Sequence, residues 1–277
     1  MSQLLLYNGK FHPNDSALIT ADNRSLRYVD GLFETMKWAN GNIQLASLHF
    51  ERLFYGLRQL EFEVPALFTP ASLTSQIKSL CEKNSHAAAR VRMLVFRGDG
   101  GLYDQQNHFP HTIIQTWALP DELPHLNENG LVTGIYPLAR KSIDAFSNIK
   151  TNNYLPYFMG ALYAKQQHWN DALILNAEGN ICDASIANLF IIKNKKLFTP
   201  ALSQGCVNGV MRRHILENIS SIGYSARETI ISKEDVLEAD EVFLTNAISG
   251  MRWVQSVEEK RYSNNECINI FQSLLKK

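Results

Sequence analysis

Apolar and polar positions alternate most clearly in ARVRMLVFR (89–97), and this period of two predicts a strand with one buried face. The strand-like runs LFETMKW (32–38) and IQL (43–45) flank Asn40-Gly41, a pair typical of a tight hairpin turn. A further β-rich run, HTIIQTWAL, follows at 111–119. The first half of the chain is therefore expected to contain an antiparallel sheet.

Between these strands the apolar period changes to that of a helix. One helix is predicted over 46–60, and a second begins at Thr69-Pro70, where proline suits the first helical turn. Each has its apolar residues on one face, so both helices are expected to be half buried. Those residues are Leu53, Leu57 and Leu60 in the first helix and Leu73, Ile77 and Leu80 in the second.

The segment PDELPHLNENG (120–130) holds two prolines, a glycine and several polar residues, a composition typical of a connection between domains. It separates a smaller α/β domain (1–119) from a larger domain (131–277), which gives a two-domain α/β (α+β) protein. The elements predicted in the larger domain are a helix over 156–169, strands at 171–176, 188–194 and 241–246, a helix after Gly209, a helix cap at Ser232–Asp235 and a terminal helix.

Composition argues for a small-molecule ligand. Lys+Arg and Asp+Glu both number 27, so no overall field favours nucleic acid or an anionic membrane. The N-terminus does not resemble a signal peptide, and no apolar run is long enough to span a bilayer. Four widely spaced cysteines suit reduced thiols in the cytoplasm, and the histidines His108 and His111 have no ligand cluster around them, so no metal site is expected.

Lys150 lies at the end of a β-like stretch and just before a helix, where a side chain projects into a crevice. Partial desolvation of a lysine there lowers its pKa, and the neutral amine can form an imine with a carbonyl. A solvated surface lysine is the alternative that this position alone leaves open.

Six segments in the same order resemble the class IV aminotransferases, the fold type IV family of pyridoxal phosphate (PLP) enzymes. The resemblance identifies Lys150 as the lysine that holds PLP as an imine. It extends over nearly the whole chain, and its segments are DGLFETM (30–36), LHFERL (48–53), NIKTNNYL (148–155), DALILNAEGNICDASIANLFII (171–192), NGVMRRHIL (208–216) and EVFLTNAISGMRWV (241–254).

The resemblance also implies a phosphate site. Gly209 and Val210 lie where a loop becomes a helix, so backbone N–H groups and the helix dipole can face an anion. Arg52 matches the phosphate-binding arginine of the family, whose guanidinium grips phosphate oxygens bidentately. Thr245 and Asn246 belong to a turn that approaches the phosphate in the family. Ala247 and Ile248 stand where a hydroxyl residue is common, which leaves part of this contact to backbone N–H groups.

Asp183 occupies the place of the family's glutamate, a carboxylate that keeps the pyridine nitrogen protonated and so makes the ring a better electron acceptor. Its side chain is one methylene shorter, so the ring either sits closer or is reached through a water. Tyr154 and Asn188 complete the contacts with PLP that the resemblance implies.

The substrate pocket is less sharply defined. Arg90, Arg92 and Arg97 on one predicted strand are candidates for binding a substrate carboxylate, and Arg27 and Tyr28 for lining the same pocket. The spacing from Lys150 to Asn153 and the loop RGDGGLY (97–103) are similar to the aminodeoxychorismate lyase branch. The arginine and histidine that follow this loop in D-amino-acid aminotransferases are missing here.

The expected activity is transamination of a small amino acid to a keto acid, with elimination of pyruvate by a 4-amino-4-deoxychorismate lyase as the alternative. Two alternatives of other classes are a lysine-imine enzyme without a cofactor and a non-catalytic ligand-binding relative. The resemblance further implies a homodimer.

Overall fold

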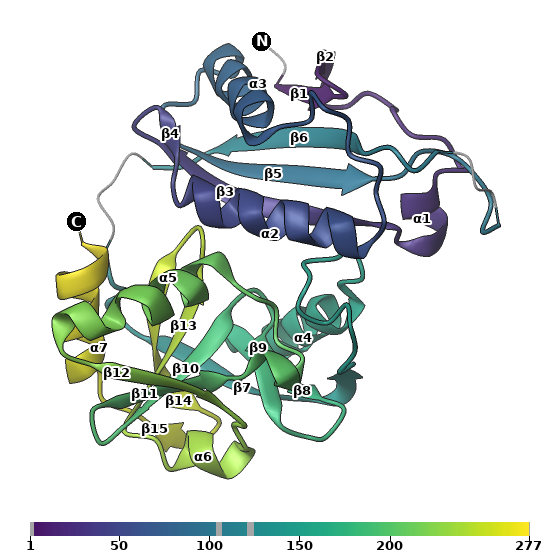
Figure 1. Ribbon diagram of the computed structural model, residues 1–277. Coiled ribbons are helices and arrows are strands. Elements are labelled where there is room, and N and C mark those ends of the chain that lie inside the picture. The colour runs from purple at the N-terminus through teal and green to yellow at the C-terminus, as the bar shows by residue number, and fades with distance from the viewer. Residues whose placement is uncertain (1–2, 104–106, 121–124, 277) are drawn as a thin grey trace. The chain divides into compact units, whose positions relative to one another are not determined.

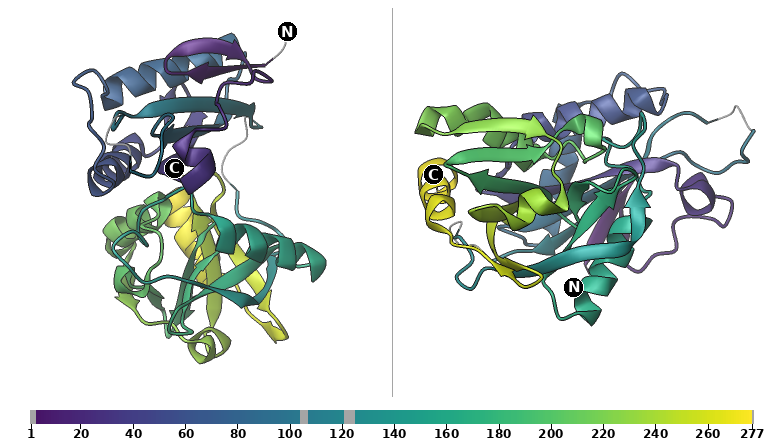
Figure 2. Two further views of the ribbon diagram at one scale, coloured as in Figure 1. Left: turned by 90° about the vertical axis from the view of Figure 1, so that its right-hand side faces the viewer. Right: turned by 90° about the horizontal axis from the view of Figure 1, so that it is seen from below.

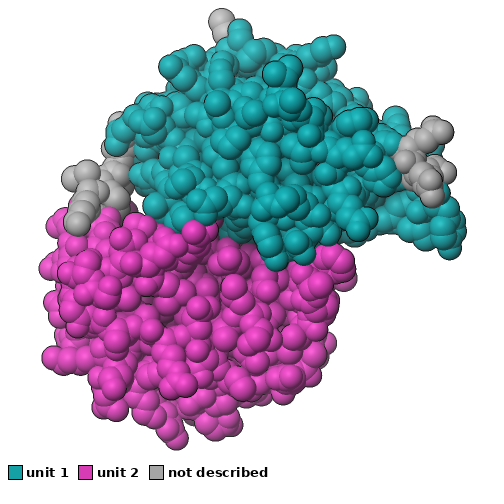
Figure 3. All heavy atoms as spheres, viewed as in Figure 1, with its two compact units in different colours: residues 1–122, 149–153 teal, residues 123–148, 154–277 magenta. Residues whose placement is uncertain are grey.

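The computed structural model describes residues 3–103, 107–120 and 125–276. The chain divides into two compact units, coloured separately in Figure 3: unit 1 comprises residues 1–122 and 149–153, and unit 2 comprises residues 123–148 and 154–277. The short segment around Lys150 thus belongs to unit 1 although the chain on both sides of it belongs to unit 2. Part of the connection predicted at 120–130 falls on residues 121–124, outside the described residues.

Unit 1 is built on a six-stranded sheet with the order β2-β1-β6-β5-β3-β4 (Figure 1). The predicted hairpin is confirmed, since Asn40 and Gly41 have φ angles of 53° and 74° and connect β3 to β4 as a turn with two left-handed residues. The strands are β1 (Leu4–Tyr7), β2 (Lys10–Pro13), β3 (Gly31–Ala39), β4 (Asn42–Ile43), β5 (Ala89–Phe96) and β6 (His111–Ala118).

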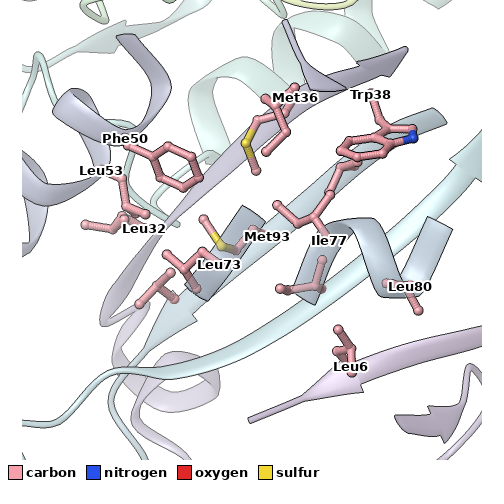
Figure 4. Packing of buried hydrophobic residues seen from close by; sticks show 14 of the residues in the cluster. Leu6, Leu32, Met36, Trp38, Phe50, Leu53, Leu73, Ile77, Leu80 and Met93 are labelled. Atoms are coloured by element: carbon pink, nitrogen blue, oxygen red, sulfur yellow. The ribbon is translucent and has the colours of Figure 1, made fainter. Parts of the chain in front are cut away.

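Two amphipathic helices cover one face of this sheet. They are α2 (Ala46–Gln59) and α3 (Pro70–Lys83), and a capping box between Thr69 and Ser72 starts the second. Their apolar faces meet inward-pointing side chains of β3 and β5, such as Met36 and Met93 (Figure 4). Within the described residues of unit 1, α2 and α3 pack on this one face, and unit 1 also contains the short helix α1 (Arg24–Tyr28).

Unit 2 contains a nine-stranded sheet with the order β12-β11-β10-β13-β14-β7-β8-β9, and β15 pairs with β14. Its strands are β7 (Leu131–Lys141), β8 (Asp171–Asn176), β9 (Ile181–Ala184), β10 (Asn188–Lys193), β11 (Lys196–Pro200), β12 (Ser225–Thr229), β13 (Glu241–Asn246), β14 (Gly250–Val257) and β15 (Lys260–Arg261).

The central strands of unit 2 are apolar on both faces. Leu189 and Leu244 face one core, whereas Phe190 and Phe243 stack on the other face, under the helices α5 and α7 (Figure 2). The helical elements of unit 2 are α4 (Leu155–Gln166), η1 (Leu202–Gln204), α5 (Val210–Asn218), η2 (Ile219–Ile222), α6 (Lys233–Leu237), α7 (Asn265–Ile270) and the π-helical turn η3 (Phe271–Leu275).

The mixed α/β fold class is confirmed, with two differences of detail. The helix predicted over 156–169 ends at Gln166, because His168 adopts the left-handed φ of 58° and Trp169 turns back to contact Tyr163. The first predicted helix ends at Gln59, one residue early.

Candidate functional site

The N-terminus of α5 is built to receive an anion. Its N-cap, Gly209, has no side chain to bond the first-turn amides, and the amides of Val210 and Met211 have no acceptor in the described part of the chain. A Cβ at position 209 would lie 1.7 Å from Oδ1 of Asn188, so only glycine fits here. The Gly209 amide itself donates to the Val207 carbonyl at 2.8 Å. Any anion site therefore begins one residue later than the sequence suggests.

A buried hydroxyl without a partner lies beside this helix end. Thr245, on β13, is 2% exposed, and its Oγ1 has no hydrogen-bond partner among the described residues. Thr245 pairs with Asn188 across β10, and Asn188 in turn abuts Gly209. A buried hydroxyl that lacks a partner costs stability unless a ligand satisfies it. Thr245 and the start of α5 therefore form one cluster of neutral donors, which we call the anion cradle.

The turn after Thr245 is closed by its own side chain. Oδ1 of Asn246 accepts the amides of Ile248 at 3.0 Å and Ser249 at 2.8 Å. The amide of Ile248, to which the sequence assigned a share of the phosphate contact, is therefore already used. Asn246 shapes the turn, and its contact with a cofactor stays a prediction.

Asp183, on β9, is buried at 1% exposure and accepts four hydrogen bonds. Oδ2 receives the Lys141 ammonium at 3.2 Å, the Tyr157 hydroxyl at 2.7 Å and the Val207 amide at 3.0 Å. Oδ1 receives the Asn188 amide at 2.8 Å. Burial and the nearby Asp183 carboxylate raise the pKa of Tyr157, which therefore stays a donor.

Tyr154 precedes α4 and stacks on Tyr157 with ring centroids 4.4 Å apart. Its hydroxyl donates to the Ser185 carbonyl at 3.1 Å. Asp183, Asn188 and Tyr154, three predicted cofactor residues, thus lie in one hydrogen-bonded and stacked group within unit 2.

Lys150 is held by unit 1. Its carbonyl accepts the Phe33 amide at 2.9 Å, and Thr151 forms a bridge with Leu32, so the segment runs along the start of β3. The ammonium lies 4.5 Å from the centroid of the Phe33 ring. Two residues earlier, the Asn148 carbonyl accepts the Asn208 amide at 3.1 Å, which ties the chain before Lys150 to the loop that leads into α5.

Arg52, on α2, is engaged by Glu34 of β3. The guanidinium donates from Nε to Oε1 at 2.8 Å and from Nη2 to Oε2 at 2.6 Å, a bidentate pair, and Nδ1 of His49 lies 2.7 Å from Oε2. Burial alone would raise the pKa of Glu34, but Arg52 and His49 outweigh it and lower that pKa to about 2. Phosphate binding by Arg52 stays a prediction, and the arginine has a structural role besides.

The other predicted arginines differ in their surroundings. Arg97 is buried. It donates hydrogen bonds to Asp30 at 2.6 Å and to the Leu60 carbonyl, and both partners belong to unit 1. Arg90 lies over the Trp117 ring at 5.2 Å, and Arg92 lies over the Phe33 ring at 4.9 Å, the same ring that Lys150 contacts. Arg92 is thus the candidate arginine that the structure brings to Lys150.

Arg27 and Tyr28 lie together at the end of α1. The Arg27 guanidinium is 5.2 Å from the Tyr28 ring centroid and 3.5 Å from Asp22. Both side chains are exposed, and their place in a substrate pocket stays a prediction.

Sequence reasoning missed Lys141, Tyr157 and Glu34. Glu34 carried a usable signal, because it shares the inward parity of Leu32 and Met36 on β3, and a carboxylate at a core position requires a cation. Lys141 and Tyr157 carried none, since they meet Asp183 only because β7 and α4 pack on β8, the strand that pairs with β9.

Some properties of the chain limit the chemistry. Burial raises the pKa of the Cys182 and Cys206 thiols, which leaves both unreactive. Among residues 3–103, 107–120 and 125–276, no group of three or more His, Cys, Asp or Glu residues is placed to hold a metal ion. The same part of the chain contains no helix long and apolar enough to cross a membrane.

Comparison with known proteins identifies the family and the fold. Residues 31–257 match the family model described as amino-transferase class IV. The chain is 28% identical over 285 residues to an aminodeoxychorismate lyase of Bacillus subtilis, covering 99% of this chain and 94% of that protein. It is 28% identical over 235 residues to an aminodeoxychorismate lyase of Vibrio harveyi, covering 85% and 86%. The branched-chain amino acid aminotransferase of Escherichia coli has the same fold, with a TM-score of 0.87, 21% identity and coverage of 100% and 95%.

Proposed function

This chain belongs to the class IV aminotransferase family, a family of enzymes, and we propose that it transaminates a small amino acid with PLP held on Lys150. The single observation that carries the proposal is the anion cradle. Thr245 offers a buried hydroxyl without a partner in the described chain, and the open amides at the start of α5 lie beside it. A phosphate monoester supplies the acceptor oxygens that such donors require.

The residues of unit 2 fit the remainder of the cofactor as well. Oδ1 of Asp183 accepts a single hydrogen bond from the described residues, and a carboxylate oxygen has room for two. Asp183 is therefore the proposed partner of the pyridine nitrogen, with Asn188 and Lys141 fixing its orientation. When bound, PLP supplies an aldehyde for covalent attachment and a ring that accepts electrons from the substrate carbon.

Lys150 has two tasks in this proposal. Its amine would hold the cofactor aldehyde, and in its free form it would move the proton at the substrate α-carbon. Arg92, which shares the Phe33 ring with Lys150, is the proposed partner of the substrate carboxylate. A guanidinium there binds a carboxylate bidentately and so orients the α-carbon.

A lyase activity is the second candidate. The two relatives from Bacillus subtilis and Vibrio harveyi are aminodeoxychorismate lyases that match this chain over most of its length, and the loop at 97–103 resembles that of the lyase branch of the family. In that case the same residues act on aminodeoxychorismate. Pyruvate is then eliminated from the substrate, and no amino group is transferred.

The test is made on purified protein incubated with PLP. We expect a yellow protein whose absorbance is lost on borohydride reduction, with the label recovered on Lys150 by peptide mass spectrometry. A colourless protein after addition of PLP contradicts the proposal and favours an enzyme without cofactor or a non-catalytic relative. A panel of aminodeoxychorismate, branched-chain L-amino acids and D-alanine then separates lyase from transaminase by the order of the rates.

Two further parts of the proposal concern context. The four buried thiols, Cys81, Cys182, Cys206 and Cys267, suit a reducing compartment, so we expect a cytoplasmic protein. By family analogy we expect a homodimer. Light scattering after size-exclusion chromatography tests the dimer, since a monomeric mass that remains active contradicts it.

A further inference from the structure

The face of the unit 1 sheet that α2 and α3 leave uncovered carries aromatic and basic side chains. On β3, Leu32 and Met36 point into the core under the two helices, so Phe33 points to the opposite face. Phe33 pairs with Leu94 of β5, and Arg92 lies two residues further along that strand on the same face. Diagonal neighbours on one face of an antiparallel pair are within reach of long side chains.

The Lys150 segment is fixed next to Phe33 by backbone contacts. The Asn152 amide donates to the Gly31 carbonyl at 3.0 Å, and the Phe33 amide donates to the Lys150 carbonyl at 2.9 Å. Gly31 has a φ of 152°, and a Cβ there would lie 2.6 Å from Nδ2 of Asn152, so the close approach of the two segments requires glycine. These contacts therefore fix the backbone position of Lys150. The direction of its side chain depends on the groups that its methylene chain and its amine contact.

One aromatic ring lies against two cationic side chains. The Lys150 ammonium is 4.5 Å and the Arg92 guanidinium carbon 4.9 Å from the centroid of the Phe33 ring. Both distances fall inside the range of about 6 Å within which a ring face attracts a cation. The Phe33 side chain is buried, so the ring is itself firmly placed.

An aromatic partner acts on the charged form of a catalytic amine. A ring face attracts the ammonium form of a lysine and so orients its nitrogen before the proton is lost. The neutral amine that then forms is the nucleophile. Arg92 lies on the same ring, and its positive charge repels a positive charge on Lys150.

We propose that Phe33 is a positioning residue, whose ring holds the Lys150 amine and the Arg92 guanidinium in one fixed relation for attack on the cofactor aldehyde. The proposal rests on the proposed function of Lys150. It assigns to Phe33 a task other than filling the core, because its ring lies on the face of the sheet opposite to that core. Arg92 is placed by the pairing of β5 with β3, and Lys150 by the backbone hydrogen bonds of its segment to β3.

The test follows the loading of PLP onto the cofactor-free protein, with Phe33→Leu, Phe33→Tyr and Phe11→Leu as variants. Phe11 is the matched control, because its ring lies 4.8 Å from the Lys83 ammonium in the same unit. The rate of borohydride-stable attachment to Lys150 is measured at rising PLP concentration. We expect the saturating rate to fall about tenfold in Phe33→Leu, while the half-saturating concentration is unchanged, since the ring orients the amine and does not bind phosphate.

Rescue separates positioning from folding. Phe33→Tyr keeps the ring and is expected to load within about twofold of the unmodified protein, as is Phe11→Leu. Arg92→Met is expected to change the loading rate in the original chain and not in the Phe33→Leu chain, because the ring carries the coupling. Melting temperatures verify that each variant is folded.

The outcomes are distinguishable. If the unmodified protein attaches no PLP to Lys150, the proposed function fails. If it does and Phe33→Leu loads as fast as Phe11→Leu, or if the loss is entirely in the half-saturating concentration, the positioning role is overturned while the proposed function stands. Additive effects of Phe33→Leu and Arg92→Met likewise refute the coupling through the ring.

Discussion

The Glu34 pair of unit 1 and the anion cradle of unit 2 differ in how their polar groups are satisfied. In unit 1 the cations Arg52 and Arg97 are paired with the carboxylates of Glu34 and Asp30, and the Glu34 pKa falls to about 2 as a result. In unit 2 the anion cradle presents neutral donors, the Thr245 hydroxyl and the first amides of α5, to which the described chain offers no anion. A pair that is satisfied internally serves the fold, whereas donors left open at a buried point indicate a ligand.

The contrast also concerns reactivity. Unit 1 carries Lys150, the proposed covalent anchor, on a sheet face with Phe33 and Arg92. Unit 2 carries the anion cradle and Asp183, the proposed partner of the pyridine nitrogen. Variants of Lys150 are therefore expected to abolish chemistry, and variants of the anion cradle to weaken binding.

The largest expected effect is that of Lys150→Ala. Turnover should fall by at least about 10³-fold, because the proposal assigns to the Lys150 amine both the attachment of the aldehyde and the transfer of the proton. Binding of PLP should persist through the anion cradle, measured by quenching of tryptophan fluorescence. Turnover that survives in this variant would remove the proposed mechanism.

The next effect tests the pair in unit 1. Arg52→Met leaves the buried Glu34 carboxylate without its bidentate partner and should lower the free energy of unfolding by about 3–5 kcal/mol. Adding Glu34→Gln to Arg52→Met should recover much of that loss in urea denaturation. The double variant then reports on phosphate binding by Arg52, since a reduced PLP affinity without instability supports it and an unchanged affinity contradicts it.

The pH dependence of stability gives the third prediction. The Glu34 pKa is lowered from its ordinary value of 4.5 to about 2, so the ionised carboxylate stabilises the fold above pH 4.5. This contribution is lost as the pH falls through about 2, and the shift corresponds to about 3 kcal/mol. Glu34→Gln should therefore flatten the acid limb of the unfolding free energy, and an unchanged limb would show that other carboxylates dominate.

The smallest effect belongs to the cradle. Thr245→Val removes a buried hydroxyl that lacks a partner, so the cofactor-free protein should be equally stable or about 1 kcal/mol more stable, while PLP affinity falls about tenfold. Thr199→Val is the matched control, because the Thr199 hydroxyl is buried and donates to the Leu189 carbonyl at 2.7 Å. That variant should lose stability and keep its affinity for PLP. Equal losses of stability in both variants would argue against a ligand at Thr245.

The sequence predicted local features well where their cause is local. The Asn40-Gly41 turn, the helix start at Thr69-Pro70, the helix cap at Ser232–Asp235 and the alternation along β5 all appear as expected. Each depends on the conformational preference or hydrogen bonds of a few neighbouring residues. The end of α4 was predicted too late, because the left-handed His168 that stops the helix carries no glycine or proline signal.

By itself the sequence determined the fold class and the family, and it predicted the lysine of the proposed chemistry, because motifs in a fixed order report which contacts a fold must make. The tertiary structure alone decided the partners: Glu34 for Arg52, Lys141 and Tyr157 for Asp183, and one ring for both Lys150 and Arg92. These pairs join residues far apart in the chain, and which of them meet depends on strand register and packing, which no local pattern encodes.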